Sequence, residues 1–219
     1  FSFQNVKDIA IFGAGGFGRE VATTIERINR KQPTWNMLGF FDDGVEKGNE
    51  ISHFGPCLGG MEQLNAYPSH LNIVIAIGNP HTLQRVRERI TNSQISYPNI
   101  IFEPFGLADP ETFTMGEGNI IQGGCWASCD VSIGNFNVLN GSVVMGHDVK
   151  IGNYNAIMPD VRISGEVTIG NGNLIGVGSI ILQQLRIGNN VNIGAGAVLM
   201  TKPKDGCTYI GNPAKLFKF

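Results

Sequence analysis

The adjacent residues His147 and Asp148 are the pair in this sequence best suited to moving a proton. An imidazole accepts a proton near neutral pH, and a neighbouring carboxylate can hold the ring in one tautomer. A base of this kind can assist an amine or hydroxyl that attacks an acyl thioester, because the attacking group must lose a proton as the bond forms. On its own, a single histidine in a loop is more often a surface residue without a chemical role, so the pair needs support from its surroundings.

A glycine-rich stretch, GAGGFG at residues 13–18, is the second candidate. An apolar run precedes it and a helical pattern follows, which is the context in which a G-x-G-x-x-G pattern has meaning. The glycines let the backbone approach a phosphate, and the helix N-terminus offers N–H groups and the positive end of a dipole. The residues expected to bind a phosphorylated ligand are Gly13, Gly15, Gly16, Phe17 and Gly18.

Two aspartates follow the next apolar run, MLGFFDD, in a position where an acidic side chain could hold a ribose or a base edge. A solvated turn explains Asp42 and Asp43 equally well, and both interpretations stay open. A third strand, NIVIAIGNP, ends at Gly78 and precedes a helix predicted over 82–90. Only about 100 residues precede the repeat described next, enough for one mononucleotide half of a dinucleotide fold. A mononucleotide-sized ligand is therefore expected in place of NAD.

The second half of the chain is a hexapeptide repeat. Every sixth residue from Met115 to Leu199 is a large apolar residue, apart from Ala127, and glycine often follows directly. This period fits neither an α-helix nor a hairpin array, but it fits a solenoid of short strands with a corner in every hexapeptide. With three hexapeptides to a coil, glycines 18 residues apart should stack, and so should Asn153, Asn171 and Asn189. The tail TKPKDGCTYIGNPAKLFKF is expected to cap the last coil.

Together, the opening IAIFGAGGFGREVA and the hexapeptide repeat resemble the sugar O-acyltransferase family. That family contains sialic acid O-acetyltransferases and N-acetyltransferases of nucleotide-linked 4-amino-sugars. Its most specific matches here are LNGSVVMGHDVKIGNYNAIMPDVRISGEVTIG and IGNNVNIGAGAVLMTKPKDGCTYIGNPAK. The resemblance implies an α/β Rossmann-like nucleotide-sugar-binding domain over 1–98 and an all-β left-handed parallel β-helix over 99–219.

The resemblance also implies roles for individual residues. His147 matches the general base, with Asp148 beside it, and the N–H of Gly165 matches the oxyanion donor. Asn140 matches an asparagine near the reaction centre, and Asn155 stands where relatives often have a second histidine that helps to orient the base. An asparagine cannot carry a proton, so we expect Asn155 to hold the substrate by a hydrogen bond at most. Acetyl-CoA, the implied co-substrate, is expected to contact Gly165, Val177 and Ala195.

The resulting hypothesis is an acetyl-CoA-dependent acetyltransferase acting on the 4-amine of a UDP- or dTDP-linked sugar in bacterial glycan biosynthesis. One alternative is O-acetylation of sialic acid or another sugar hydroxyl. Another is a trimeric scaffold without catalytic activity. Relatives form trimers with the active site between adjacent β-helices, so a homotrimer with an inter-subunit site is expected.

The composition excludes several other classes. The 219 residues carry a formal net charge of −2, which offers no basic field for nucleic acid. No apolar run approaches the roughly 18 residues of a membrane helix, and the start lacks a signal-peptide pattern, so we expect a cytoplasmic protein without membrane insertion. The histidines His53, His70 and His81 are expected at the surface. The four cysteines, expected as reduced thiols that bind no metal, are Cys57, Cys125, Cys129 and Cys207.

Overall fold

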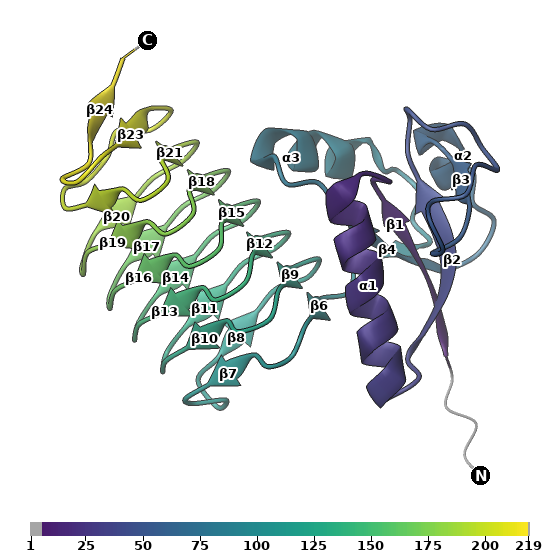
Figure 1. Cartoon of the computed structure of the whole chain (residues 1–219), viewed down its shortest axis with the longest axis horizontal. Coiled ribbons are helices and arrows are strands. Elements are labelled where there is room, and N and C mark those ends of the chain that lie inside the picture. Colours follow the sequence, from purple (N-terminus) through teal and green to yellow (C-terminus); the bar gives the residue numbers. More distant parts are fainter. Residues whose placement is uncertain (1–5, 219) are drawn as a thin grey trace. The chain divides into compact units, whose positions relative to one another are not determined.

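The computed structural model describes residues 6–218, which divide into two compact units (Figure 1). The first comprises residues 1–78 and 82–100, and the second comprises 79–81 and 101–219. Each unit has its own sheets, and each is described separately below.

The first unit is built on a five-stranded parallel sheet with strand order β3-β2-β1-β4-β5. A parallel sheet covered on both faces needs nearly continuous apolar strands, which explains the burial of Ile9 to Phe12 and of Leu71 to Ile75. The strands are β1 (Lys7–Phe12), β2 (Trp35–Phe41), β3 (Cys57–Gly59), β4 (Leu71–Ile75) and β5 (Ile95–Ser96).

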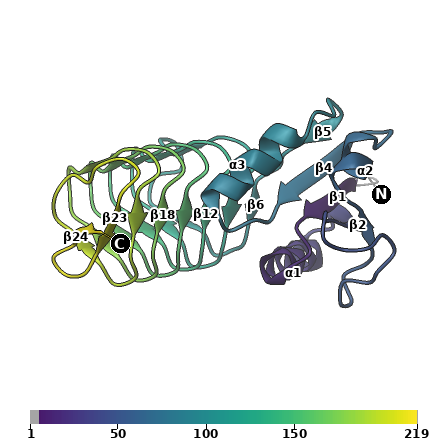
Figure 2. The same ribbon diagram turned by 90° about the horizontal axis from the view of Figure 1, so that it is seen from above.

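Three helices connect these strands: α1 (Gly16–Lys31), α2 (Met61–Asn65) and α3 (Pro80–Arg89). Helix α1 is amphipathic and buries Val21, Ala22 and Ile25. Helix α1 connects β1 to β2, which lies on one side of β1, and α3 follows β4, which lies on the other side. Because both connections have the same handedness, the two helices cover opposite faces of the sheet (Figure 2). The predicted half of a dinucleotide fold is confirmed in this unit, and the point where the strand order reverses lies between β1 and β4.

The second unit is a β-solenoid whose coils stack along three faces (Figure 1). Between residues 114 and 199, strands pair in parallel 18 residues apart, as with Val144 and Arg162. The six-stranded face contains β7 (Gly106–Leu107), β10 (Trp126–Ala127), β13 (Val144–Met145), β16 (Arg162–Ile163), β19 (Ile180–Ile181) and β22 (Val198–Leu199).

The other two faces continue the same register. The five-stranded face contains β8 (Thr114–Met115), β11 (Ser132–Ile133), β14 (Lys150–Ile151), β17 (Thr168–Ile169) and β20 (Arg186–Ile187). The eight-stranded face contains β6 (Ile100–Ile101), β9 (Ile120–Ile121), β12 (Val138–Leu139), β15 (Ala156–Ile157), β18 (Leu174–Ile175), β21 (Asn192–Ile193), β23 (Thr208–Ile210) and β24 (Lys215–Phe217).

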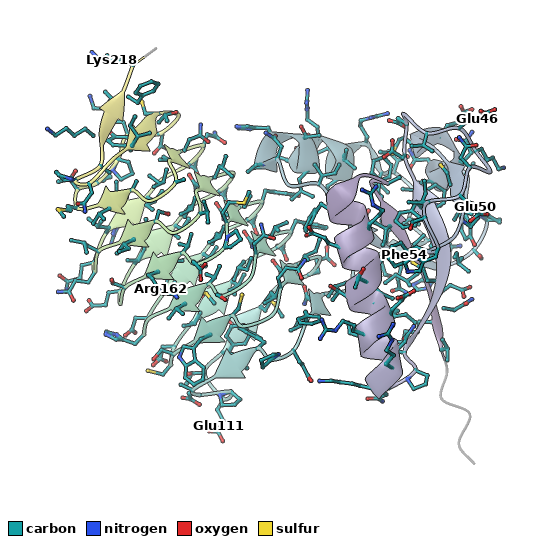
Figure 3. All side chains as sticks on the ribbon, in the orientation of Figure 1. Glu46, Glu50, Phe54, Glu111, Arg162 and Lys218 are labelled. Carbon is teal, nitrogen blue, oxygen red and sulfur yellow. The ribbon has the colours of Figure 1, made fainter. Side chains whose placement is uncertain are left out.

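The hexapeptide register determines the core. The second residue of each two-residue strand points inward, and residues such as Leu139, Met145 and Ile175 have no exposed surface. The valines two positions earlier, including Val143 and Val161, form the predicted second inward layer. The first residue of a strand points outward, as Arg162 does in Figure 3. The glycines stack as predicted, because a Cβ on Gly152 would lie only 2.5 Å from the carbonyl oxygen of Gly170.

Two asparagine ladders run along one edge of the solenoid. In the outer ladder, the side-chain oxygens of Asn153, Asn171 and Asn189 each accept the backbone N–H of the asparagine in the preceding coil, as the sequence predicted. An inner ladder, absent from the prediction, is fully buried and consists of Asn119, Asn137, Asn155 and Asn173. Together they pair polar groups that a sharp corner would otherwise leave without partners.

The tail returns against the last coil. Strand β23 pairs in parallel with β21, and β24 pairs with β23 in the antiparallel direction. Tyr209 enters the solenoid core, and its hydroxyl accepts the N–H of Lys204. The last apolar residues of the coils are thus covered.

Candidate active site

The three corners of the solenoid differ in the backbone N–H groups that they leave free. At the corner after the five-stranded face, the outer asparagine ladder accepts the corner N–H groups. We call the corner after the six-stranded face the His147 corner; its successive coils carry Cys129, His147, Gly165 and Gln183. Within residues 6–218, the N–H groups of these four residues donate to no acceptor. This row is therefore available to a ligand.

His147 and Asp148 form a close pair in this corner. Nδ1 of His147 lies 2.8 Å from Oδ2 of Asp148, and both side chains are 56% exposed. Asp148 has a left-handed backbone with φ 58°, a conformation that aspartate tolerates, and its N–H donates to the carbonyl of Cys129. When Nδ1 donates to the carboxylate, Nε2 keeps its lone pair and can accept a proton.

Gly165 lies directly beside this ring, in the next coil. A Cβ on Gly165 would be only 2.5 Å from Nε2 of His147. In the described part of the chain, no acceptor faces the N–H of Gly165. The structure thus brings three predicted site residues together: His147, Asp148 and Gly165 with its free N–H.

The remaining predicted residues of the solenoid lie at another corner. Val177 and Ala195 belong to the corner before the six-stranded face, which we call the Val177 corner; Val177 is 47% exposed, and neither N–H has an acceptor among residues 6–218. Asn140 begins the same corner, one coil before Met158, and its Nδ2 donates to Sδ of Met158 at 3.3 Å. Because Asn140 precedes β13 and His147 follows it, a single chain places them at opposite ends of that strand.

Asn155 has a different environment from the one expected. It belongs to the inner ladder, has no exposed surface, and donates from Nδ2 to Asn137 Oδ1 and to the carbonyl of Gly170. Its own Oδ1 accepts from the backbone and side chain of Asn173. The amide is therefore engaged within the solenoid, and we leave Asn155 out of the substrate site proposed below.

The glycine turn in the first unit combines two kinds of glycine. Gly13 has φ 110° and Gly18 packs against its carbonyl, so both are required by the fold. In contrast, a Cβ on Gly15 or Gly16 would meet nothing within 4 Å. Gly15 is the N-cap of α1 without a side-chain cap, and the following Phe17 is half-buried. The turn itself does not need glycine at 15 and 16, and the missing side chains leave the backbone there open to an approaching ligand.

Gly78, predicted as the end of the third strand, lies just after β4, which ends at Ile75, and its position has equally open space around it. A Cβ there would also meet open space, and its φ lies outside the left-handed region. It follows β4, whereas Gly15 follows β1, so the three unconstrained glycines flank the point where the strand order reverses. The signal in the sequence was a single glycine after an apolar run, which is too common to single out.

The two aspartates have protein partners. Asp42 accepts the N–H of Ala14 at 2.8 Å and the N–H of Gly44, so it holds the glycine turn against the end of β2. Asp43 accepts the N–H of Met61 at the start of α2 and pairs with Arg89 at 3.1 Å. Contact of either residue with a nucleotide stays a prediction.

The cysteines and histidines elsewhere offer no second centre. All four cysteines are free, and burial raises the pKa of the Cys125 thiol, which disfavours its thiolate. His53, His70 and His81 are exposed, as expected. Across residues 6–218, no three His, Cys, Asp or Glu side chains gather in a way that could hold a metal ion. None of the helices in this range is long and apolar enough to cross a membrane.

Comparison with known families and structures agrees with both halves of the chain. The family described as the PglD N-terminal domain matches residues 8–90, and the family described as bacterial transferase hexapeptide (six repeats) matches residues 166–200. The acetyltransferase domain of PglB from Neisseria gonorrhoeae is 25% identical, with a TM-score of 0.86 over 96% of this chain and 100% of that one. In its fold and its repeat, the chain is similar to the left-handed β-helix acyltransferases of the hexapeptide family.

Two further structures resemble this acyltransferase over nearly its whole length. WeeI from Acinetobacter baumannii is 26% identical, with a TM-score of 0.86 over 97% of this chain and 100% of that one. PerB from Caulobacter crescentus, solved with CoA and GDP-perosamine, shares the fold at 23% identity and a TM-score of 0.83 over 97% and 98% of the two chains. No curated protein sequence matches the acyltransferase. The predicted fold, a Rossmann-like domain followed by a left-handed β-helix, is confirmed, and so is the prediction of an acyltransferase.

Proposed function

We propose that this acyltransferase transfers the acetyl group of acetyl-CoA to the 4-amine of a nucleotide-activated sugar, with His147 as the general base. The observation that carries the proposal is the placement of Nε2 of His147 beside Gly165 while Asp148 holds Nδ1. The acetyltransferase domain of PglB, a 25% identical relative, has been solved with acetyl coenzyme A, which supports this donor.

Each group in the His147 corner has a defined task in this reaction. Nε2 of His147 removes a proton from the amine as its nitrogen bonds to the thioester carbonyl carbon. The N–H of Gly165 donates to the oxyanion that forms on the carbonyl oxygen. The carbon–sulfur bond then breaks, and the proton held by His147 passes to the departing CoA sulfur. Asp148 stabilises the imidazolium between these steps.

The six-stranded face explains why we propose a homotrimer. Its outward side chains are apolar apart from Arg162, with Trp126 45% and Ile180 38% exposed, whereas Lys150 and Arg186 project from the five-stranded face. The His147 corner borders one edge of the six-stranded face and the Val177 corner borders the other. Packing this face against a second copy would bury the apolar surface and let the His147 corner meet the Val177 corner of a neighbour. Acetyl-CoA would then lie along Val177, Ala195 and the neighbour's Gly165.

The glycine turn explains why we propose a nucleotide-linked acceptor. The free N–H groups at the start of α1 and the open space over Gly15, Gly16 and Gly78 suit a diphosphate. A free sugar would give these positions nothing to bind. PerB, which shares the fold, was solved with GDP-perosamine, a sugar of the proposed class.

The substitution Gly15→Val tests the acceptor. The valine has room in the apo protein, so its side chain should exclude only the phosphate. We expect the KM for a UDP- or dTDP-4-amino-sugar to rise about tenfold or more, the loss of about one charge-assisted hydrogen bond, while the KM for acetyl-CoA is unchanged. The matched control is Thr23→Val, an exposed position further along α1 that should leave both constants unaltered.

Competition by nucleotides completes this experiment. UDP or dTDP should inhibit competitively against the acceptor in the wild type and more weakly in Gly15→Val. The proposal is wrong if no nucleotide competes and free sialic acid is acetylated efficiently; that result would establish O-acetylation of a free sugar.

A further inference from the structure

The side chains of the His147 corner form a column in which one member is missing. Successive coils contribute Cys129, His147, Gly165 and Gln183. Of these four residues, only Gly165 has no side chain. The imidazole of His147 occupies this gap. A Cβ on Gly165 would lie 2.5 Å from Nε2 and 2.8 Å from Cε1, closer than a real Cβ approaches, and 3.0 Å from Cδ2, which is tighter than most contacts.

The backbone does not explain why residue 165 is a glycine. Its φ is not in the left-handed region, so an alanine would fit the local conformation. Gly152 and Gly170 differ, because a Cβ there would collide with the backbone carbonyl of the next coil. At Gly165 the nearest atoms all belong to the ring of His147. What glycine supplies here is room for the imidazole.

We propose that the missing side chain at Gly165 positions the His147 imidazole, in addition to the N–H that the residue offers. This inference rests on the proposed function of His147 as the base. Because Gly165 has no side chain, the imidazole of His147 can lie against the backbone of Gly165 while Nδ1 stays 2.8 Å from Oδ2 of Asp148. A methyl group in the gap displaces Nε2 from the donor and from the acceptor amine. Gly165 is therefore a positioning residue as well as a donor.

A double-mutant cycle tests the inference, because Gly165→Ala retains the backbone N–H and changes only the space. We expect Gly165→Ala to lower kcat/KM about 10- to 100-fold, as a displacement near 1 Å can do. In a His147→Ala background the same substitution should cost almost nothing, since the ring that it displaces is gone. Equal losses in both backgrounds would show that the methyl group blocks substrate and would overturn the inference.

Controls separate this inference from the proposed function. If His147→Ala alone leaves activity intact, the proposed base is wrong. If it lowers activity to a measurable residual level but the cycle is additive, only the positioning role is wrong. Thr168→Ala, on the five-stranded face and outside the His147 corner, should keep wild-type activity. The ring signals of His147, one of only four histidines, should shift in Gly165→Ala in NMR spectra and stay unchanged in Thr168→Ala.

The stability of the same variants provides a second test of the inference. If Gly165→Ala fails to fold, the double variant His147→Ala/Gly165→Ala should fold, because the methyl group then has no ring to meet. A double variant as unstable as Gly165→Ala would mean that the methyl group strains the coil itself, and the inference would fail.

Discussion

At the scale of single residues, the candidate site depends on a short-range arrangement around one imidazole. Asp148 lies next to His147 in the chain and reaches Nδ1 only because its backbone adopts φ 58°. Gly165 is 18 residues away and reaches Nε2 only because the coils stack. The two nitrogens of one ring are thus placed by two different levels of structure.

The first prediction concerns this imidazole. His147→Ala should lower kcat by about 10²–10⁴-fold, because the amine then loses its proton acceptor, while acetyl-CoA affinity measured by calorimetry stays nearly unchanged. Asp148→Asn should cost less, since an asparagine can accept from Nδ1 but brings no charge to the imidazolium. Turnover within about threefold of the wild type for His147→Ala would contradict the assignment.

At the scale of elements, the two ladders show how a solenoid built from two-residue strands keeps its corners rigid. Each inner-ladder amide pairs with the coil before it and with a backbone carbonyl, entirely out of solvent. The outer ladder makes the same kind of pairs at the surface, where water can replace a missing partner. The corners without a ladder are the ones that carry the candidate site, so rigidity and ligand access are separated by corner.

The second prediction compares the ladders. Asn137→Ala should lower the free energy of unfolding by about 1–3 kcal/mol, because it leaves the N–H of Asn155 and the carbonyl of Gly152 without their side-chain partner. The matched substitution Asn171→Ala in the exposed ladder should cost clearly less. Urea denaturation of both variants measures the difference, and equal losses would show that burial does not set the strength of the ladder.

At the scale of the whole molecule, one chain carries the parts of the proposed site on two corners. His147 and Gly165 lie on one side of the six-stranded face, and Val177 and Ala195 lie on the other. The largely apolar outer surface of the six-stranded face lies between these two pairs of residues. Association through this face would bring His147 and Gly165 of one copy next to Val177 and Ala195 of another. This is the reason for proposing that assembly is required for activity.

The third prediction tests assembly through mixed oligomers. His147→Ala and Ala195→Trp should each be inactive alone, the second because its side chain fills the proposed CoA groove. After unfolding and refolding as a 1:1 mixture, hybrid trimers should recover about one quarter of wild-type activity if each site joins residues of two copies. No recovery, or a fully active monomer by light scattering, would contradict the inter-subunit site.

The sequence alone predicted the fold of both halves and singled out His147 as the proposed base. A period of six requires an inward residue in every strand, so the core from Ile121 to Leu199 could be read directly, and G-x-G-x-x-G after an apolar run indicated the turn before α1. What only the tertiary structure decided depends on contacts between coils or strands far apart in the chain. Asn155 is buried because Asn137 and Asn173 stack on it, and Asp43 caps α2 because β2 ends beside Met61. Likewise, the imidazole of His147 lies against Gly165 because hexapeptides 18 residues apart stack on each other. The repeat in the sequence predicts that these two residues are close, but it does not predict in which direction the side chain of His147 points.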